Sequence, residues 1–273
     1  QPDIVILGGV NKHTLKLFLF AKRKRIEISL FTDMWQLPFS KLSKSSQFLR
    51  KLLYKHSDQF IVPGKKSEQH IKETIPESLS PKIHILPFTL QVSNFPFTPN
   101  FSEVKEFDLL FSGRIDEGKL PLFFVEVVSK INMNRKIKVL VIGDGRLKGE
   151  MQTKLVIKEI DHTYAGYIAQ ERLQSYYSKC KVLLFPTSLD TWGIVANEAL
   201  SVGVPVIISP NAGAANDLII SGKNGFVLEN DVELWTQKTI EILNREHVFV
   251  FEAPPTKEMV AEDLLKSLID VVY

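Results

Sequence analysis

The chain has 273 residues, 44% hydrophobic and 24% charged, which is ordinary composition for one large or two average globular domains. Its single cysteine, Cys180, excludes an internal disulfide, and its densest apolar stretch, residues 120–128, is too short to span a bilayer. The net charge of +3 is uneven, because residues 1–100 carry 15 Lys and Arg against 7 Asp and Glu. The chain opens with QPDIVILGG, a strand pattern without an initiator methionine, and we interpret Gln1 as an artificial or processed start.

Short apolar runs alternate along the chain with longer amphipathic stretches. This alternation predicts an α/β protein whose parallel sheets are covered on both faces. The expected strands are residues 3–7, 26–32, 59–62, 82–86, 108–112, 136–142, 163–166, 181–186, 205–209 and 225–228, and the clearest helices are 120–132, 169–178, 193–202 and 232–244.

A domain boundary is expected where the sequence reads QVSNFPFTPN, because these residues contain two prolines and follow neither a helical nor a strand period. We therefore predict a first domain over residues 1–98 and a second over 99–255. Residues 256–273 contain a final amphipathic helix that packs back toward the first domain. In such folds ligands bind outside the carboxyl ends of the strands, so the residues that follow each strand are candidates for a site.

Two glycine turns follow predicted strands. The first, GRIDEGK, places the cations Arg114 and Lys119 where the next helix begins, an arrangement that suits a pyrophosphate. The alternative is a solvated turn with ordinary basic residues. The second turn, at Gly143, lacks the third glycine of a dinucleotide fingerprint because Lys148 stands there, and a tight turn is the default interpretation.

The stretch after the strand 181–186 holds two acidic residues, Asp190 and Glu198, separated by seven residues. Asp190 lies in a loop, whereas Glu198 lies in the second turn of a helix that begins near Gly193. A carboxylate among small apolar residues needs hydrogen-bond donors, and a ribose diol supplies them. The alternative is a capped surface helix with an exposed Glu198. After the next strand, small residues at 212–215 let backbone N–H groups approach an anion.

Four segments resemble the motifs of retaining GT-B glycosyltransferases of the group 1 class: FSGRIDEGK, VIGDG, DTWGIVANEALSVGVPVI and GAANDLIISGKNGFVL. They occur in order and with the family's spacing over residues 107–229. The resemblance implies two facing Rossmann-like domains. Residues 1–98 resemble only the later part of the family's acceptor domain, in PDIVILGG, ISLFTDMW and YKHSDQFIVPGKKSEQHI, so we expect a truncated first domain and a fragment.

The resemblance also implies roles for single residues. Arg114 and Lys119 would hold the donor diphosphate, Glu198 the ribose hydroxyls and Asp190 the transferred sugar. Asp190 stands where the family has Glu, Asp217 stands at a structural position where Glu is frequent, and Thr32 replaces a frequent His. The implied catalytic residues are Asp190, Arg114 and Lys119, and the implied donor-binding residues are Gly113, Arg114, Lys119, Gly143, Tyr167, Ile168, Asp190, Gly193, Ile194, Val195 and Glu198.

The implied function is transfer of a sugar, with retained configuration, from a nucleoside diphosphate sugar to a glycan or lipid-linked acceptor. No D-x-D motif occurs, and we expect no cofactor, no metal and no nucleic-acid partner. A non-catalytic nucleotide-sugar-binding module and another GT-B activity, such as an epimerase or a phosphorylase, remain alternatives.

The basic first part of the chain bears on localisation. We expect a cytoplasmic protein, and residues 15–20 together with the cations at 22–25 are a candidate for peripheral contact with an anionic membrane. Two simpler interpretations stay open: a solvated helix end for the cations, and the buried side of a Rossmann helix for residues 15–20.

Overall fold

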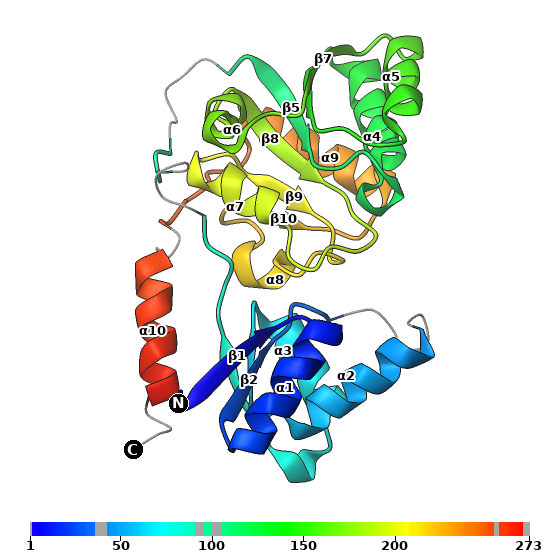
Figure 1. Cartoon of the computed structure of the whole chain (residues 1–273). Coiled ribbons are helices and arrows are strands. Elements are labelled where there is room, and N and C mark those ends of the chain that lie inside the picture. The colour runs from blue at the N-terminus through cyan, green and yellow to red at the C-terminus, as the bar shows by residue number, and fades with distance from the viewer. Residues whose placement is uncertain (1, 36–42, 91–95, 100–104, 254–256, 270–273) are drawn as a thin grey trace. The chain divides into compact units, whose positions relative to one another are not determined.

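The structure is a computed structural model that describes residues 2–35, 43–90, 96–99, 105–253 and 257–269 (Figure 1). The chain forms two compact units, residues 1–88 with 258–273 and residues 89–257. From the sequence we predict these boundaries at 98/99 and 255/256 instead. Residue 98 lies in the second unit, where the Thr98 N–H donates to the Ser201 carbonyl at 3.0 Å. The junctions themselves, at 91–95, 100–104 and 254–256, fall outside the described residues.

The first unit is a four-stranded parallel sheet in chain order. Its strands are β1 (Ile4–Gly8), β2 (Glu27–Phe31), β3 (Gln59–Val62) and β4 (Lys82–Ile85), and its helices are α1 (Lys12–Lys24), α2 (Lys44–His56), α3 (Lys65–Thr74), the 3-10 turn η2 (Glu77–Leu79) and α10 (Lys257–Ile269). Asn11 caps α1 by accepting from the N–H groups of His13 and Thr14. As the sequence predicts, the helix ends in a basic turn, and the Arg25 that follows it lies in the left-handed region.

The exposure of side chains on α1 contradicts the interpretation that residues 15–20 are the buried side of a helix. Residues 15–20 are not simply the buried side of a helix, because Leu17, Leu19 and Phe20 are 54%, 47% and 55% exposed, whereas Phe18 is 3% exposed. At 3.6 residues per turn only one stripe of a helix faces the sheet, and here Phe18 and Ala21 occupy it.

The second unit is a six-stranded parallel sheet in the order β10-β9-β8-β5-β6-β7. Its strands are β5 (Phe107–Ser112), β6 (Lys138–Ile142), β7 (Asp161–Gly166), β8 (Cys180–Phe185), β9 (Val206–Ile208) and β10 (Gly225–Val227). Its helices are η3 (Glu117–Lys119, 3-10), α4 (Pro121–Asn134), α5 (Lys148–Ile157), α6 (Gln170–Tyr177), α7 (Ile194–Ser201), α8 (Ala215–Leu218) and α9 (Val232–Leu243).

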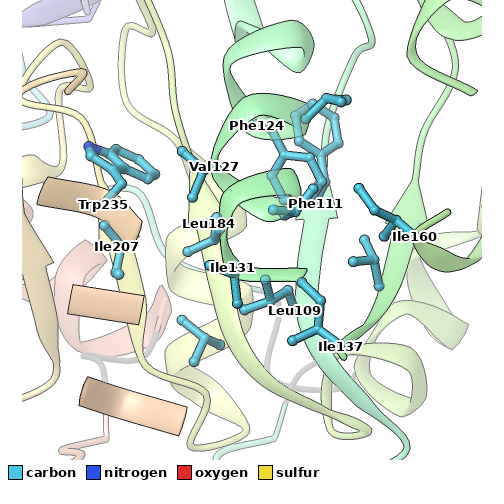
Figure 2. Packing of buried hydrophobic residues seen from close by; sticks show 14 of the residues in the cluster. Leu109, Phe111, Phe124, Val127, Ile131, Ile137, Ile160, Leu184, Ile207 and Trp235 are labelled. Carbon is cyan, nitrogen blue, oxygen red and sulfur yellow. The ribbon is translucent and has the colours of Figure 1, made fainter. Parts of the chain in front are cut away.

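The side chains of successive strand residues pack into two separate apolar layers. Leu109 and Phe111 of β5 pack with α4, α5 and α9, whereas Leu110 packs with α6 and α7. Figure 2 shows the first layer, where Phe124 of α4 lies against Phe111 with their ring centroids 5.2 Å apart. This double burial explains why the strands are apolar throughout rather than alternating.

All ten predicted strands are present, and no strand end differs from its prediction by more than two residues. Strand β6 begins at Lys138 rather than at 136. At this end of the strand the backbone N–H groups donate to side chains instead of to a neighbouring strand. The Ile137 N–H donates to Asn132 Oδ1 and the Lys138 N–H donates to Asp108 Oδ2 at 2.9 Å. No helix in the described ranges is long and apolar enough to cross a membrane.

The strand order reverses between β5 and β8, which are neighbours in the sheet but are separated by β6 and β7 in the chain. Such a reversal leaves a crevice at the carboxyl ends of the two strands, because the connections that leave them run in opposite directions. The loops after β5 and β8, residues 113–119 and 186–193, therefore border this crevice.

Candidate functional site

The loop after β5 is tied to the loop after β8. The Gly118 carbonyl accepts from the Thr187 hydroxyl at 2.8 Å and from the Ser188 N–H at 2.9 Å. The turn then closes with Leu120 in the left-handed region, at φ 46°, before Pro121 begins α4. These bonds fix where Lys119 projects.

Asp190 is held by its backbone and its side chain. Its N–H donates to the Asn211 carbonyl and its carbonyl accepts from the Gly213 N–H, both at 3.0 Å. Its Oδ1 accepts from the Trp192 N–H at 3.0 Å, and its Oδ2 forms an ion pair with Lys119 Nζ. The two side chains are 14% exposed for Lys119 and 19% for Asp190, so solvent screens the pair less than a surface pair.

The amino end of α7 lies directly after Asp190. Gly193 caps this helix at φ 100° and, having no side chain, offers no acceptor to the first N–H groups of α7. A Cβ at Gly193 would lie 2.5 Å from Cε1 of Phe185, and one at Gly213 would lie 2.0 Å from the Thr191 carbonyl oxygen. Both glycines are therefore required by close packing around the Asp190 loop.

Glu198 projects from the second turn of α7 and is only 6% exposed, which excludes the exposed surface glutamate considered from sequence. Its Oε2 accepts from the Tyr177 hydroxyl at 2.6 Å, and the Tyr177 oxygen lies 2.7 Å from Ser112 Oγ. Burial raises the pKa of Glu198 to about 7 because it penalises the charged form, and the Tyr177 hydrogen bond opposes this rise.

The remaining predicted residues differ in their exposure and in their hydrogen bonds. The Arg114 side chain is 80% exposed, with its Nε 3.5 Å from Asp116 Oδ2. The Gly113 and Gly143 N–H groups donate to the carbonyls of Ile142 and Gly166, so neither is available to a ligand. Tyr167 is 84% exposed, Ile194 is 39% exposed, and Ile168 and Val195 pack partly buried against the second apolar layer.

Gly143 has a packing role that the sequence does not reveal. A Cβ there would lie 1.8 Å from the Gly113 carbonyl oxygen, and its φ is 128°. The Gly113 carbonyl can lie this close to the turn after β6 because residue 143 has no Cβ.

The sequence analysis gave no role to Tyr177, whose hydroxyl reaches Glu198, or to Ser112, whose hydroxyl lies against that of Tyr177. Tyr177 ends α6 and lies in none of the four motifs, whereas Ser112 ends β5 and is the second residue of the motif FSGRIDEGK. Only Ser112 carried a signal, since it is the last residue of a strand at the edge where ligands bind.

Within the described parts of the chain, no group of three or more His, Cys, Asp or Glu side chains could hold a metal ion.

Comparison with known proteins places the chain in a family. The profile of the family described as Glycosyl transferases group 1 matches residues 95–257. The chain therefore belongs to the group 1 glycosyltransferases, as the four motifs predict.

Two curated relatives illustrate the sequence similarity. The chain is 28% identical over 204 residues to the GalNAc-alpha-(1->4)-GalNAc-alpha-(1->3)-diNAcBac-PP-undecaprenol alpha-1,4-N-acetyl-D-galactosaminyltransferase of Campylobacter jejuni, covering 74% of this chain and 55% of that protein. It is 29% identical over 176 residues to the capsular polysaccharide biosynthesis glycosyltransferase CapM of Staphylococcus aureus, covering 58% of this chain and 44% of that protein. The chain thus spans about half the length of these relatives.

Solved structures confirm the fold class. The pneumococcal O-GlcNAc transferase GtfA, solved in complex with UDP and GlcNAc, superposes with a TM-score of 0.73 at 16% identity, covering 99% of this chain and 57% of that one. At this identity the likeness shows an α/β fold of the GT-B type and nothing finer.

Proposed function

We propose that the chain is the donor-binding part of a glycosyltransferase that moves a sugar from a nucleoside diphosphate sugar to a glycan or lipid-linked acceptor. The observation that carries the proposal is the Lys119–Asp190 ion pair at the crevice between β5 and β8. There a cation, a carboxylate and the amino end of α7 meet at one place. These are the groups that a diphosphate and a sugar hydroxyl would each require.

Each part of the donor has a partner in this arrangement. The diphosphate carries negative charge that Lys119, Arg114 and the first N–H groups of α7 would neutralise. Asp190 would accept hydrogen bonds from hydroxyls of the transferred sugar. Glu198, buried one turn further along α7, would accept from the ribose diol. Tyr167 and Ile168, which follow β7, would lie beside the base.

The reaction that we propose retains the anomeric configuration. The bond from the anomeric carbon to the diphosphate oxygen breaks while the acceptor oxygen attacks from the same face, and the acceptor proton passes to the leaving phosphate oxygen. Negative charge grows on the diphosphate during this step, so Lys119 and Arg114 would stabilise the transition state more than the ground state. In this proposal the two cations take the place that a metal fills in other glycosyltransferases.

A second proposal concerns the first unit, where α1 presents Leu17, Leu19 and Phe20 to solvent beside basic residues. We propose peripheral contact with an anionic membrane surface through this face. Apolar side chains flanked by Lys and Arg are the composition that interfacial helices use, and each basic residue near such a surface contributes about 1 kcal/mol. Such contact would bring the protein to the surface that carries a lipid-linked acceptor.

The proposed function is tested by thermal shift with a panel of UDP- and GDP-sugars, because a ligand that binds only the folded state raises the unfolding midpoint. We expect a rise with at least one nucleoside diphosphate sugar, and transfer by the full-length protein that survives EDTA. Binding without transfer or hydrolysis by the full-length protein would favour a non-catalytic module. Activity lost on chelation and restored by Mn²⁺ or Mg²⁺ would contradict metal independence.

A further inference from the structure

Tyr177 is a buried polar residue that has no role in the proposed function. It is the last residue of α6 and is 0% exposed within the apolar layer that α6 and α7 build against the sheet. The end of α6 is fixed from β5 and the residues before it, because Lys105 Nζ donates to the Ser178 carbonyl at 2.6 Å and the Phe107 N–H donates to the Lys179 carbonyl at 3.0 Å. The backbone that carries the phenol ring is therefore held in place by these hydrogen bonds.

The hydroxyl of Tyr177 has a defined place for its one proton. An ionised carboxylate can only accept, so the tyrosine proton points to Glu198 Oε2, 2.6 Å away. The hydroxyl of Ser112, 2.7 Å from the tyrosine oxygen, is then free to donate to it. Two successive hydrogen bonds therefore lead from Ser112 at the end of β5, through the Tyr177 hydroxyl on α6, to the Glu198 carboxylate on α7.

This pair of hydrogen bonds holds one oxygen of Glu198 and leaves the other available to a ligand. Within the described residues the Glu198 carboxylate accepts its hydrogen bond at Oε2 alone. A glutamate side chain has three rotatable bonds, and a buried fixed donor selects one of its orientations. A carboxylate that is already oriented loses less entropy when it binds a diol.

We propose that Tyr177 is a positioning residue for ribose recognition, which holds the Glu198 carboxylate so that its second oxygen faces the ribose diol of the donor. This inference rests on the proposed function, in which Glu198 binds that diol. A phenylalanine would fill the same space in the apolar layer without the free-energy cost of burying a hydroxyl. We therefore assign a function to the hydroxyl itself.

The test compares nucleotides with and without the diol. The Tyr177→Phe variant should stay folded and bind UDP or GDP about tenfold more weakly than the unmodified chain, while its affinity for the 2′,3′-dideoxy analogues stays unchanged. Loss of the donor also raises the pKa of Glu198 further, so the pH midpoint of UDP or GDP binding should move upward. A residue that only packs would not move that midpoint.

The matched control is Tyr54→Phe in the first unit. Tyr54 is 2% exposed and its hydroxyl lies 3.2 Å from Thr32 Oγ1, so the same atom is removed from a similar buried network. We expect this variant to bind UDP and GDP normally and to keep the original pH midpoint. An equal loss of diol discrimination in both variants would overturn the assignment to Tyr177.

The outcomes separate the two proposals. If the unmodified chain binds no nucleoside diphosphate, the proposed function fails and the positioning role fails with it. If it binds and prefers the diol, but Tyr177→Phe keeps the same preference and pH midpoint, only the positioning role is overturned. Should Tyr177→Phe not fold, Ser112→Ala takes its place: a smaller loss of diol preference supports the chain of hydroxyls, and unchanged preference overturns it.

Discussion

Lys119 and Asp190 are 71 residues apart in the chain, yet their side chains form an ion pair at the carboxyl edge of the second sheet. Asp190 also accepts from the Trp192 N–H, so one carboxylate connects the loop after β5 to the amino end of α7. A diphosphate entering the crevice would find Lys119 already desolvated and oriented. In the proposed function this pair would hold the Lys119 ammonium in place for the diphosphate, and until the ligand binds the Asp190 carboxylate balances its charge.

The first prediction concerns the phosphate contact. Lys119→Ala should weaken binding of UDP or GDP by about 1.5–3 kcal/mol, or roughly 10- to 150-fold, because it removes a charge-assisted hydrogen bond. Binding of the free nucleoside, which has no phosphate, should not change. Arg114→Ala should act in the same direction. Titration calorimetry measures both ligands.

The control for Lys119 is Lys130→Ala, because Lys130 pairs with Glu233 on the helical face of the same unit. Its affinity for UDP and GDP should match that of the unmodified chain. If Lys119→Ala weakened nucleoside and nucleoside diphosphate equally, the phosphate assignment would be wrong.

The second prediction concerns pH. The pKa of Glu198 is raised to about 7 in the folded state, above its usual value of 4.5. Its contribution to stability is therefore fully present below about pH 4.5 and is lost as pH rises through 7. Glu198→Gln should raise the thermal midpoint relative to the unmodified chain at pH 8 but not at pH 4.5, which differential scanning calorimetry measures.

Ligand binding should show the opposite trend, because a diol donates to the ionised carboxylate. UDP or GDP affinity should rise about tenfold from pH 6 to pH 8 if only the ionised form of Glu198 binds. The Glu198→Gln variant should bind more weakly and without that rise. An equal rise in the variant would assign the pH dependence to another group.

The third prediction concerns Gly193. Gly193→Ala places a Cβ 2.5 Å from Cε1 of Phe185 at a φ of 100°, so we expect about 1–3 kcal/mol of destabilisation and weaker nucleotide binding. Urea unfolding measures the free energy. The control is Gly149→Ala in α5, where a Cβ meets nothing within 4 Å, and where alanine should stabilise by about 0.5–1 kcal/mol. Destabilisation by both variants alike would show that the contact with Phe185 is not the cause.

The fourth prediction concerns the outer face of α1. The unmodified chain should co-sediment with anionic vesicles and not with neutral ones, and high salt should release it. Lys16→Glu combined with Arg23→Glu should abolish the binding. Lys136→Glu combined with Lys158→Glu, on exposed positions of the second unit, changes the net charge equally and should leave it intact. Loss of binding in both double variants would attribute it to overall charge rather than to α1.

The sequence alone determined the ten strands, their order along the chain and the clearest of the helices between them. All ten strands followed from apolar runs that a sheet buried on both faces requires, and four motifs at strand ends identified the family. These signals are local in the chain, because periodicity and turn chemistry act within about ten residues. The sequence also placed Asp190 in a loop and Glu198 in the second turn of its helix.

Only the tertiary structure decided which side chains meet. The reversal of strand order between β5 and β8 brings Lys119 to Asp190, and the packing of α6 beside α7 brings Tyr177 to Glu198. The exposure of Phe20 and the burial of Phe18 were likewise set by which stripe of α1 meets the sheet. Such contacts depend on the order of strands and on the faces that helices bury, and neither is encoded in the spacing of residues along the chain.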